Sequence, residues 1–177
     1  KALLLYHEIM AMGQKLLELI DIHSPMEVSS KFSMPLSKMI ENSRMNLMRI
    51  IHYPPLNSNI KDGSIRASAH GDINLITVLP ASLESGLQVQ TKTGEWIDVG
   101  CEPEYLVINS GDMLHECSGG YYPSTIHRVI NPKGKSAKLP RYTMPVFIHP
   151  RDEVILSNKY TAKSFLDERL KEIGLKS

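Results

Sequence analysis

A histidine and an aspartate stand two residues apart at the head of an apolar run, in the segment RASAHGDINLITVLP (Arg66–Pro80). Successive side chains of a β-strand point to opposite faces, so His70 and Asp72 would share one face, and Gly71 between them leaves the other face uncrowded. An imidazole and a carboxylate on one face can bind a metal ion. The same two residues could also cap a turn or pair with Arg66.

His127, in the segment STIHRVIN, is the best candidate for a third ligand because it lies in a separate β-type run. Two imidazoles and one carboxylate form the ligand set that leaves three coordination positions open on non-haem Fe(II). Taken alone, a histidine such as His127 is more often a hydrogen-bonded core residue than a metal ligand. The remaining histidines have no partner at ligand spacing and are expected to be structural or surface groups: His7, His23, His52, His115 and His149.

A candidate anion site follows in the segment RYT, where Arg141 and Thr143 would share a strand face by the same alternation. A guanidinium offers a planar, bidentate fork to a carboxylate, and a neighbouring hydroxyl can donate one more hydrogen bond.

The expected secondary structure changes along the chain from helical at both ends to β-type in the middle. Apolar residues recur at helical spacing from Leu4 to Ile20, Pro35–Asn42 suits a shorter helix, and Thr161–Leu175 returns to helical spacing. Between the helical segments, turn residues separate short β-type runs, which predict an antiparallel sandwich or barrel of the jelly-roll type. We therefore expect a mainly β fold with flanking helices and a double-stranded β-helix (jelly roll, cupin-like) core. The runs are NLMRIIHY, INLITVL, GLQVQ, EWIDVG, EYLVINS, DMLHEC, STIHRVIN and RYTMPVFIHP.

Bulk composition narrows the possible partners. The chain has 177 residues and a net charge of +1, which gives no electrostatic reason to expect nucleic acid or an anionic membrane as a partner. No apolar run approaches the roughly 20 residues of a membrane-spanning helix. Cys101 and Cys117 are too few for a disulfide framework, so we expect a cytoplasmic protein.

Several ordered motifs resemble the Fe(II)- and 2-oxoglutarate-dependent dioxygenase superfamily, in particular its isopenicillin N synthase-like branch. That branch carries H-x-D, a distal H followed by R-V, and R-x-S, which here read HGD, HRV and RYT. The segment LMRIIHYPP resembles the family's LRxNYYPP and places Tyr53 where the family usually contacts the oxoacid. Further similarity runs through GLQVQ, GEWIDV, VINSGDML and GGYYPSTIHRV.

The resemblance implies an enzyme that oxidises a small organic molecule with O₂ and releases succinate and CO₂. Its cofactors would be Fe(II), with 2-oxoglutarate as co-substrate. No protein general base or nucleophile is required, so both cysteines are expected to be buried structural thiols. The implied metal ligands are His70, Asp72 and His127, and the implied oxoacid contacts are Arg141, Thr143 and Tyr53.

The chain departs from the family pattern in places. Gly71 stands where the family commonly has Thr, Thr143 where it has Ser, and Ile51 and His52 where it often has Asn and Tyr. We expect residues 1–177 to form a single dioxygenase domain that lacks the family's N-terminal region. Its parts would be a helical lead-in (1–44), a jelly-roll core (45–150) and a C-terminal helical tail (151–177).

Two other functions are compatible with these residues. Some members of the same branch are Fe(II) oxidases that use no oxoacid, and the chain could also be a non-catalytic metal-binding jelly-roll module. The sequence specifies neither the prime substrate nor the oligomeric state.

Overall fold

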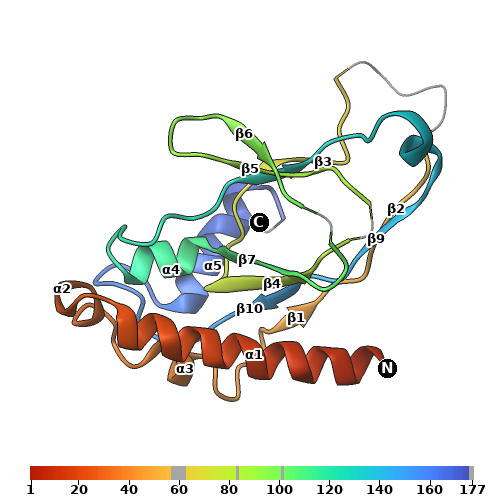
Figure 1. Cartoon of the computed structure of the whole chain (residues 1–177). Helices are drawn as coiled ribbons and strands as arrows, with labels where there is room; N and C mark the ends of the chain where they lie inside the picture. The colour runs from red at the N-terminus through yellow and green to blue at the C-terminus, as the bar shows by residue number, and fades with distance from the viewer. Residues whose placement is uncertain (57–62, 83, 101, 176–177) are drawn as a thin grey trace.

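The computed structural model describes residues 1–56, 63–82, 84–100 and 102–175 (Figure 1). Its helices are α1 (Ala2–His23), α2 (Met26–Ser29), α3 (Leu36–Met39), α4 (Asp112–Cys117), the 3₁₀ helix η1 (Gly134–Lys138) and α5 (Ala162–Glu172). Its strands are β1 (Leu47–Met48), β2 (Ile51–Tyr53), β3 (Ala67–His70), β4 (Ile76–Pro80), β5 (Leu87–Gln90), β6 (Trp96–Asp98), β7 (Leu106–Ser110), β8 (His127–Val129), β9 (Arg141–Thr143) and β10 (Val146–Ile148).

The strands form antiparallel sheets that enclose a common interior. One sheet has the order β1-β10-β4-β7, a second has the order β3-β8-β5-β6, and β2 pairs with β9. In Figure 1 the second sheet lies above the first, and the β2-β9 pair lies at one end. The predicted mainly β architecture with flanking helices is confirmed.

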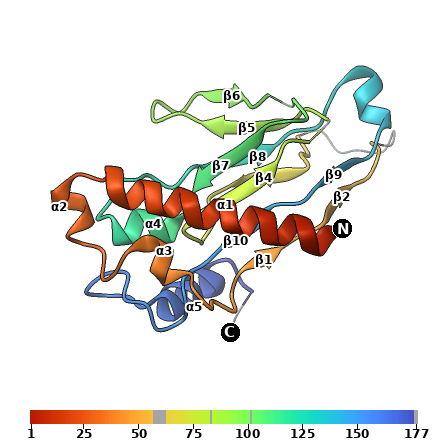
Figure 2. The same cartoon turned by 60° about the horizontal axis from the view of Figure 1, so that its bottom comes forward.

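Helix α1 covers the outer face of the first sheet, where it contacts β10 and β4 (Figure 2). Ile9 and Leu17 bury its inner face, and Gly13 allows a close approach because an added Cβ would lie 2.1 Å from the Cδ1 atom of Ile148. The apolar spacing from Leu4 to Ile20 predicted the helix but not the exact face that packs on the sheet, because Leu4, Met12 and Leu19 are exposed. None of the described helices is long and apolar enough to cross a membrane.

The segment NLMRIIHY was predicted as one β-type run, but it contributes to two sheets. Its first part, β1, pairs with β10, and its second part, β2, pairs with β9. The partner strands are themselves separated at Met144 and Pro145, and Arg49 donates its backbone N–H to the carbonyl of Pro145 (3.0 Å). The break between β1 and β2 therefore lies opposite the interruption between their partner strands, β10 and β9.

The segment DMLHEC was predicted as a β-type run and is instead helix α4. Met113, Leu114 and Cys117 are buried, at a spacing that places them on one side of a helix. The backbone N–H groups of Gly111 and Asp112 donate to the carbonyls of Leu75 (2.9 Å) and Asp72 (2.7 Å). These contacts anchor the start of α4 on the loop between β3 and β4, which local apolar content could not indicate.

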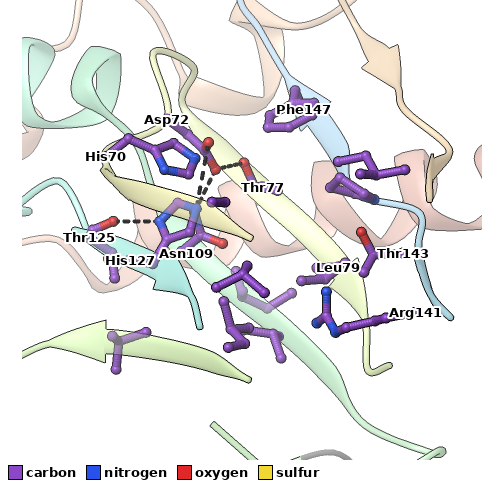
Figure 3. Close-up of a pocket in the computed structure, with 18 of the residues that line it drawn as sticks. His70, Asp72, Thr77, Leu79, Asn109, Thr125, His127, Arg141, Thr143 and Phe147 are labelled. Atoms are coloured by element: carbon purple, nitrogen blue, oxygen red, sulfur yellow. Dashed lines mark hydrogen bonds and ion pairs between the residues drawn. The ribbon is translucent and has the colours of Figure 1, made fainter. Parts of the chain in front are cut away.

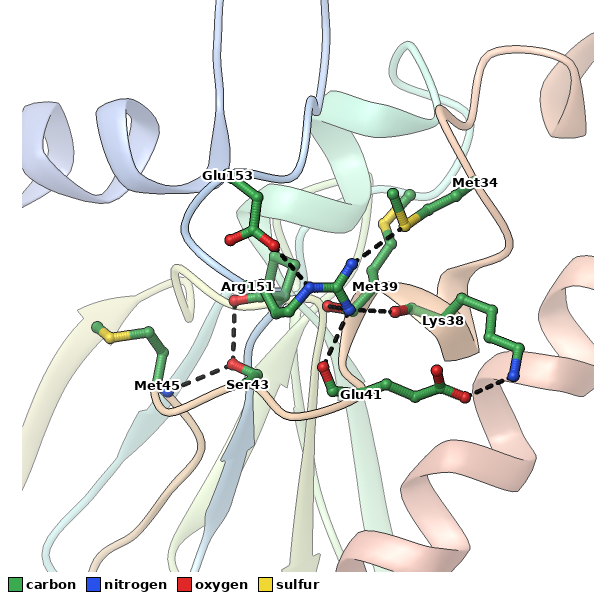
Figure 4. Close-up of polar contacts among 9 residues, drawn as sticks. Met34, Lys38, Met39, Glu41, Ser43, Met45, Arg151 and Glu153 are labelled. Carbon is green, nitrogen blue, oxygen red and sulfur yellow. Dashed lines mark hydrogen bonds and ion pairs between the residues drawn. The ribbon is translucent and has the colours of Figure 1, made fainter.

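Arg151 ties the segment after β10 to the end of α3 (Figure 4). Its Nη1 donates to the carbonyls of Lys38 (2.6 Å) and Glu41 (2.9 Å), and its Nε donates to Glu153 (2.7 Å). The last carbonyls of a helix have no partner within the helix, so the guanidinium satisfies groups that would otherwise need solvent.

Candidate metal centre

The fold brings His70, Asp72 and His127 together, with one possible ligand atom from each lying within 4.8 Å of the others. His70 ends β3 and His127 begins β8, and the two residues are partners in the ladder between these strands. Asp72 lies in the loop after β3, and its Oδ1 is 3.9 Å from Nε2 of His127. Figure 3 shows the three side chains converging at one end of a pocket.

Backbone carbonyls set the tautomer of both imidazoles. Nδ1 of His70 lies 2.7 Å from the carbonyl of Ser68, and Nδ1 of His127 lies 3.0 Å from the carbonyl of Thr125. A carbonyl oxygen only accepts, so each Nδ1 carries the proton in the neutral ring and each Nε2 keeps its lone pair. This arrangement suits two imidazoles that bind a metal through Nε2.

Asp72 is 6% exposed, and its carboxylate is hydrogen-bonded to the first sheet. Its Oδ2 accepts hydrogen bonds from Oγ1 of Thr77 (2.5 Å) and Nδ2 of Asn109 (2.7 Å). The sequence analysis assigned neither Thr77 nor Asn109 to the site. Their signal is a polar residue inside each of two strongly apolar strand segments, INLITVL and EYLVINS.

Arg141, Thr143 and Tyr53 line the same pocket from the β2-β9 pair. Arg141 is 3% exposed, its Nε donates to the carbonyl of Glu84 (3.1 Å), and its Cζ lies 5.5 Å from the centre of the Tyr53 ring. Figure 3 shows Arg141 and Thr143 at the end of the pocket away from the histidines. Mostly apolar side chains line the space between, including Ile51, Leu79, Val89, Val107, Val129 and Phe147.

Among the described residues, neither Cys117 nor any histidine other than His70 and His127 lines this pocket. His52 is exposed and stacks on Tyr142, with ring centroids 4.7 Å apart. His149 is partly buried, and this burial lowers the pKa of its imidazole. Burial raises the pKa of the Cys117 thiol to about 12, which leaves it a poor nucleophile, and Cys101 lies outside the described residues.

Gly71, where the family commonly has Thr, is closely packed in this chain. An added Cβ would lie 2.7 Å from Oγ of Ser124 and 3.1 Å from Oδ1 of Asp112. A larger residue between the two candidate ligands would therefore require at least Ser124 to move.

Comparison with known proteins identifies the family to which this chain is related. The model of the 2OG-Fe(II) oxygenase superfamily matches residues 44–150. The 2-oxoglutarate-dependent dioxygenase citB of Monascus ruber is 43% identical over 94 residues, which are 51% of this chain. A crystal structure described as an oxygenase from Shewanella oneidensis has a TM-score of 0.91 at 50% identity and covers 98% of this chain. One described as a 2OG-Fe(II) oxygenase family protein from Caulobacter crescentus has a TM-score of 0.77 at 35% identity and covers 96%.

The chain spans only part of each of these proteins. The matched regions are 29% of the Monascus protein, 64% of the Shewanella chain and 57% of the Caulobacter chain. The family match nevertheless covers more than half of this chain and includes all six residues that the sequence motifs single out. The chain therefore belongs to the 2OG-Fe(II) oxygenase superfamily.

Proposed function

We propose that the protein is a non-haem Fe(II)- and 2-oxoglutarate-dependent oxygenase that oxidises a small organic substrate with O₂ and releases succinate and CO₂. One observation carries the proposal. A set of two imidazoles and one carboxylate lies at one end of a pocket, and a buried guanidinium with a neighbouring hydroxyl lies at the other.

The donor set fits a divalent iron. His70 and His127 would bind through their Nε2 atoms and Asp72 through Oδ1, since Oδ2 is already occupied by Thr77 and Asn109. This is the ligand set of the non-haem Fe(II) oxygenases. Iron and 2-oxoglutarate, when bound, would supply the oxidising chemistry, in which the oxoacid loses CO₂.

The opposite end of the pocket would hold the distal carboxylate of 2-oxoglutarate. Arg141 offers a bidentate fork, Thr143 adds a hydroxyl, and the Tyr53 ring flanks the guanidinium. Because Arg141 and Thr143 are almost fully buried, their attraction for a carboxylate is little screened by solvent. The protein thereby orients the oxoacid along the pocket axis.

The pocket lining supports a small, largely apolar prime substrate. In the described residues, the charged or imidazole side chains lining the pocket are the three candidate ligands and Arg141, so a bound 2-oxoglutarate would leave mostly apolar walls for the substrate. A net charge of +1 supports a protein that binds neither nucleic acid nor membranes. The unpaired, buried Cys117 supports a reducing compartment such as the cytoplasm.

The test is an anaerobic titration of the apo-protein with Fe(II) and then 2-oxoglutarate, followed by the visible charge-transfer band of the chelated oxoacid. His127→Ala should abolish the band. Arg141→Ala should raise the 2-oxoglutarate concentration needed by roughly 10- to 100-fold, the cost of losing hydrogen bonds to a charged group. Arg128→Ala is the matched control, because Arg128 adjoins a ligand in sequence but packs on the Trp96 ring at 4.0 Å.

Each outcome separates the candidate functions. Iron binding without a band would favour an oxidase that uses no oxoacid, and succinate formation would then be absent. A band in the wild-type protein without succinate formation under O₂, across a screen of small apolar substrates, would favour a non-catalytic binding module. Absence of iron binding would refute the enzymatic proposal for this chain.

A further inference from the structure

The two oxygens of the Asp72 carboxylate have different surroundings. Oδ1 faces the candidate metal position, 3.9 Å from Nε2 of His127. Oδ2 faces the first sheet, where it accepts from Thr77 at 2.5 Å and from Asn109 at 2.7 Å. Figure 3 shows the Thr77 and Asn109 side chains reaching the carboxylate from the sheet side.

A third buried residue determines which way the Thr77 hydroxyl points. Nδ2 of Asn74 donates to Oγ1 of Thr77 over 2.7 Å. An amide nitrogen only donates and the hydroxyl has one proton, so that proton is directed to Oδ2 of Asp72. Asn74 thus makes Thr77 a donor to the carboxylate rather than an acceptor from elsewhere.

The donors lie on two paired strands of the first sheet. Thr77 on β4 and Asn109 on β7 are directly opposite each other in the ladder between these strands. Thr77 is 3% exposed, Asn109 8% and Asn74 0%. Charge-assisted hydrogen bonds from buried donors on the strands of a sheet restrict the rotation of the Asp72 carboxylate.

We propose that Thr77 and Asn109, supported by Asn74, are positioning residues that keep Oδ2 of Asp72 occupied and present Oδ1 alone to the metal. The inference rests on the proposed function. Its consequence concerns the open coordination positions, since a carboxylate that offered both oxygens would take up one of the three that a bidentate oxoacid and O₂ need. Holding Oδ2 on the sheet preserves that position.

The test compares Fe(II) affinity and the visible band of the Fe(II)–2-oxoglutarate complex in a matched set of variants, all anaerobically. Thr77→Val removes one donor at nearly constant volume, Thr77→Ser restores the hydroxyl, and Asn109→Ala removes the second donor from a different strand. Val78→Ala is the control. Val78 is buried in the core next to Thr77 and does not line the pocket, so this change lowers stability without touching the carboxylate.

Thr77→Val and Asn109→Ala should each weaken Fe(II) binding by roughly 10- to 100-fold, as expected when a partner of a metal ligand is lost, and should shift the band. Thr77→Ser and Val78→Ala should bind Fe(II) with the wild-type constant and give the wild-type band. Asn109→Ala decides the matter if Thr77→Val does not fold.

The failure of this inference differs from the failure of the proposed function. If the wild-type protein binds iron and 2-oxoglutarate, and both donor variants match it in affinity and band position, the positioning role is refuted while the oxygenase proposal stands. If Val78→Ala weakens iron binding as much as Thr77→Val, the effect is one of general stability and the positioning role is again refuted. If the wild-type protein itself binds no iron, the proposed function fails first.

Discussion

Replacement of Gly111 by alanine should disturb the candidate metal centre through the backbone that carries Asp72. Gly111 precedes α4 with φ −108° and ψ 178°, a conformation that alanine adopts freely, so any cost is steric. An added Cβ would lie 2.2 Å from the carbonyl oxygen of Asn74, 2.4 Å from its Oδ1 and 2.8 Å from the carbonyl oxygen of Asp72. Two of these three atoms belong to the backbone and cannot rotate away.

The magnitude follows from what must move. Overpacking a buried site costs about 1–3 kcal/mol, and a clash with backbone belongs at the upper end of that range. For a chain of this size, 1 kcal/mol shifts Tm by roughly 2–4 °C, so a loss of about 3 kcal/mol lowers Tm by about 6–12 °C. A backbone shift that relieved the clash would also disturb two hydrogen bonds, in which the N–H of Gly111 donates to the carbonyl of Leu75 and the N–H of Asp112 donates to the carbonyl of Asp72. We therefore expect weaker Fe(II) binding in addition to lower stability.

The assay is thermal unfolding of the apo-protein followed by Fe(II) titration, with Gly13→Ala as the comparison. At Gly13 the added Cβ would meet the Cδ1 atom of Ile148, the flexible end of a side chain, at 2.1 Å. Alanine also gains about 1 kcal/mol over glycine inside a helix, so the change in unfolding free energy should stay within about 1 kcal/mol. Gly111→Ala with a wild-type Tm and wild-type iron affinity would refute the steric reasoning.

Three other perturbations test separate parts of the structure. Burial lowers the pKa of His149 below its ordinary value of 6.5, so the unfolded state binds more protons at mildly acidic pH. The unfolding free energy of the apo-protein should therefore fall as the pH drops below 6.5 towards the lowered pKa. His149→Gln should reduce this pH dependence, measured by denaturant unfolding at several pH values. An unchanged pH dependence would contradict the role given to His149. Arg151→Gln removes the Nη1 bonds to the carbonyls of Lys38 and Glu41 and should lower the unfolding free energy by about 2 kcal/mol, measured by denaturant titration, while iron affinity stays at the wild-type value. With a pKa of about 12, the Cys117 thiol should resist alkylation by iodoacetamide in the folded Cys101→Ser variant and react once that variant is unfolded. Mass spectrometry would measure the alkylation. Rapid alkylation of the folded protein would contradict the burial of Cys117.

Local sequence was sufficient to predict the type of fold and to single out the candidate site residues. The side-chain alternation of a strand applies to RYT, which forms strand β9, so the shared face of Arg141 and Thr143 could be predicted from spacing alone. In HGD only His70 lies in a strand, and Asp72 reaches the site from the loop after β3. The β-type run around His127 supplied a candidate third ligand, and the resemblance to the oxygenase superfamily then added Tyr53 to the candidate site. In the structure all six candidate residues line one pocket.

Other features depended on how distant segments meet. The segment DMLHEC has the apolar content of a strand but is a helix, because its first backbone N–H groups find partners in the loop that carries Asp72. Likewise, NLMRIIHY divides between two sheets because its partner strands are interrupted at Met144 and Pro145. The local propensity of a segment indicates neither where its backbone finds hydrogen-bond partners nor where its partner strand is interrupted.

The sequence by itself determined which groups could bind a metal and an anion, since that depends on residue type and on short spacing along the chain. Only the tertiary structure decided how Asp72 is held. Asn109 lies 37 positions from Asp72 in the chain, and it reaches Oδ2 together with Thr77 because β4 and β7 pair in a register that places the two donors side by side. A hydrogen bond forms only at specific distance and direction, and for residues this far apart the packing of the strands supplies both.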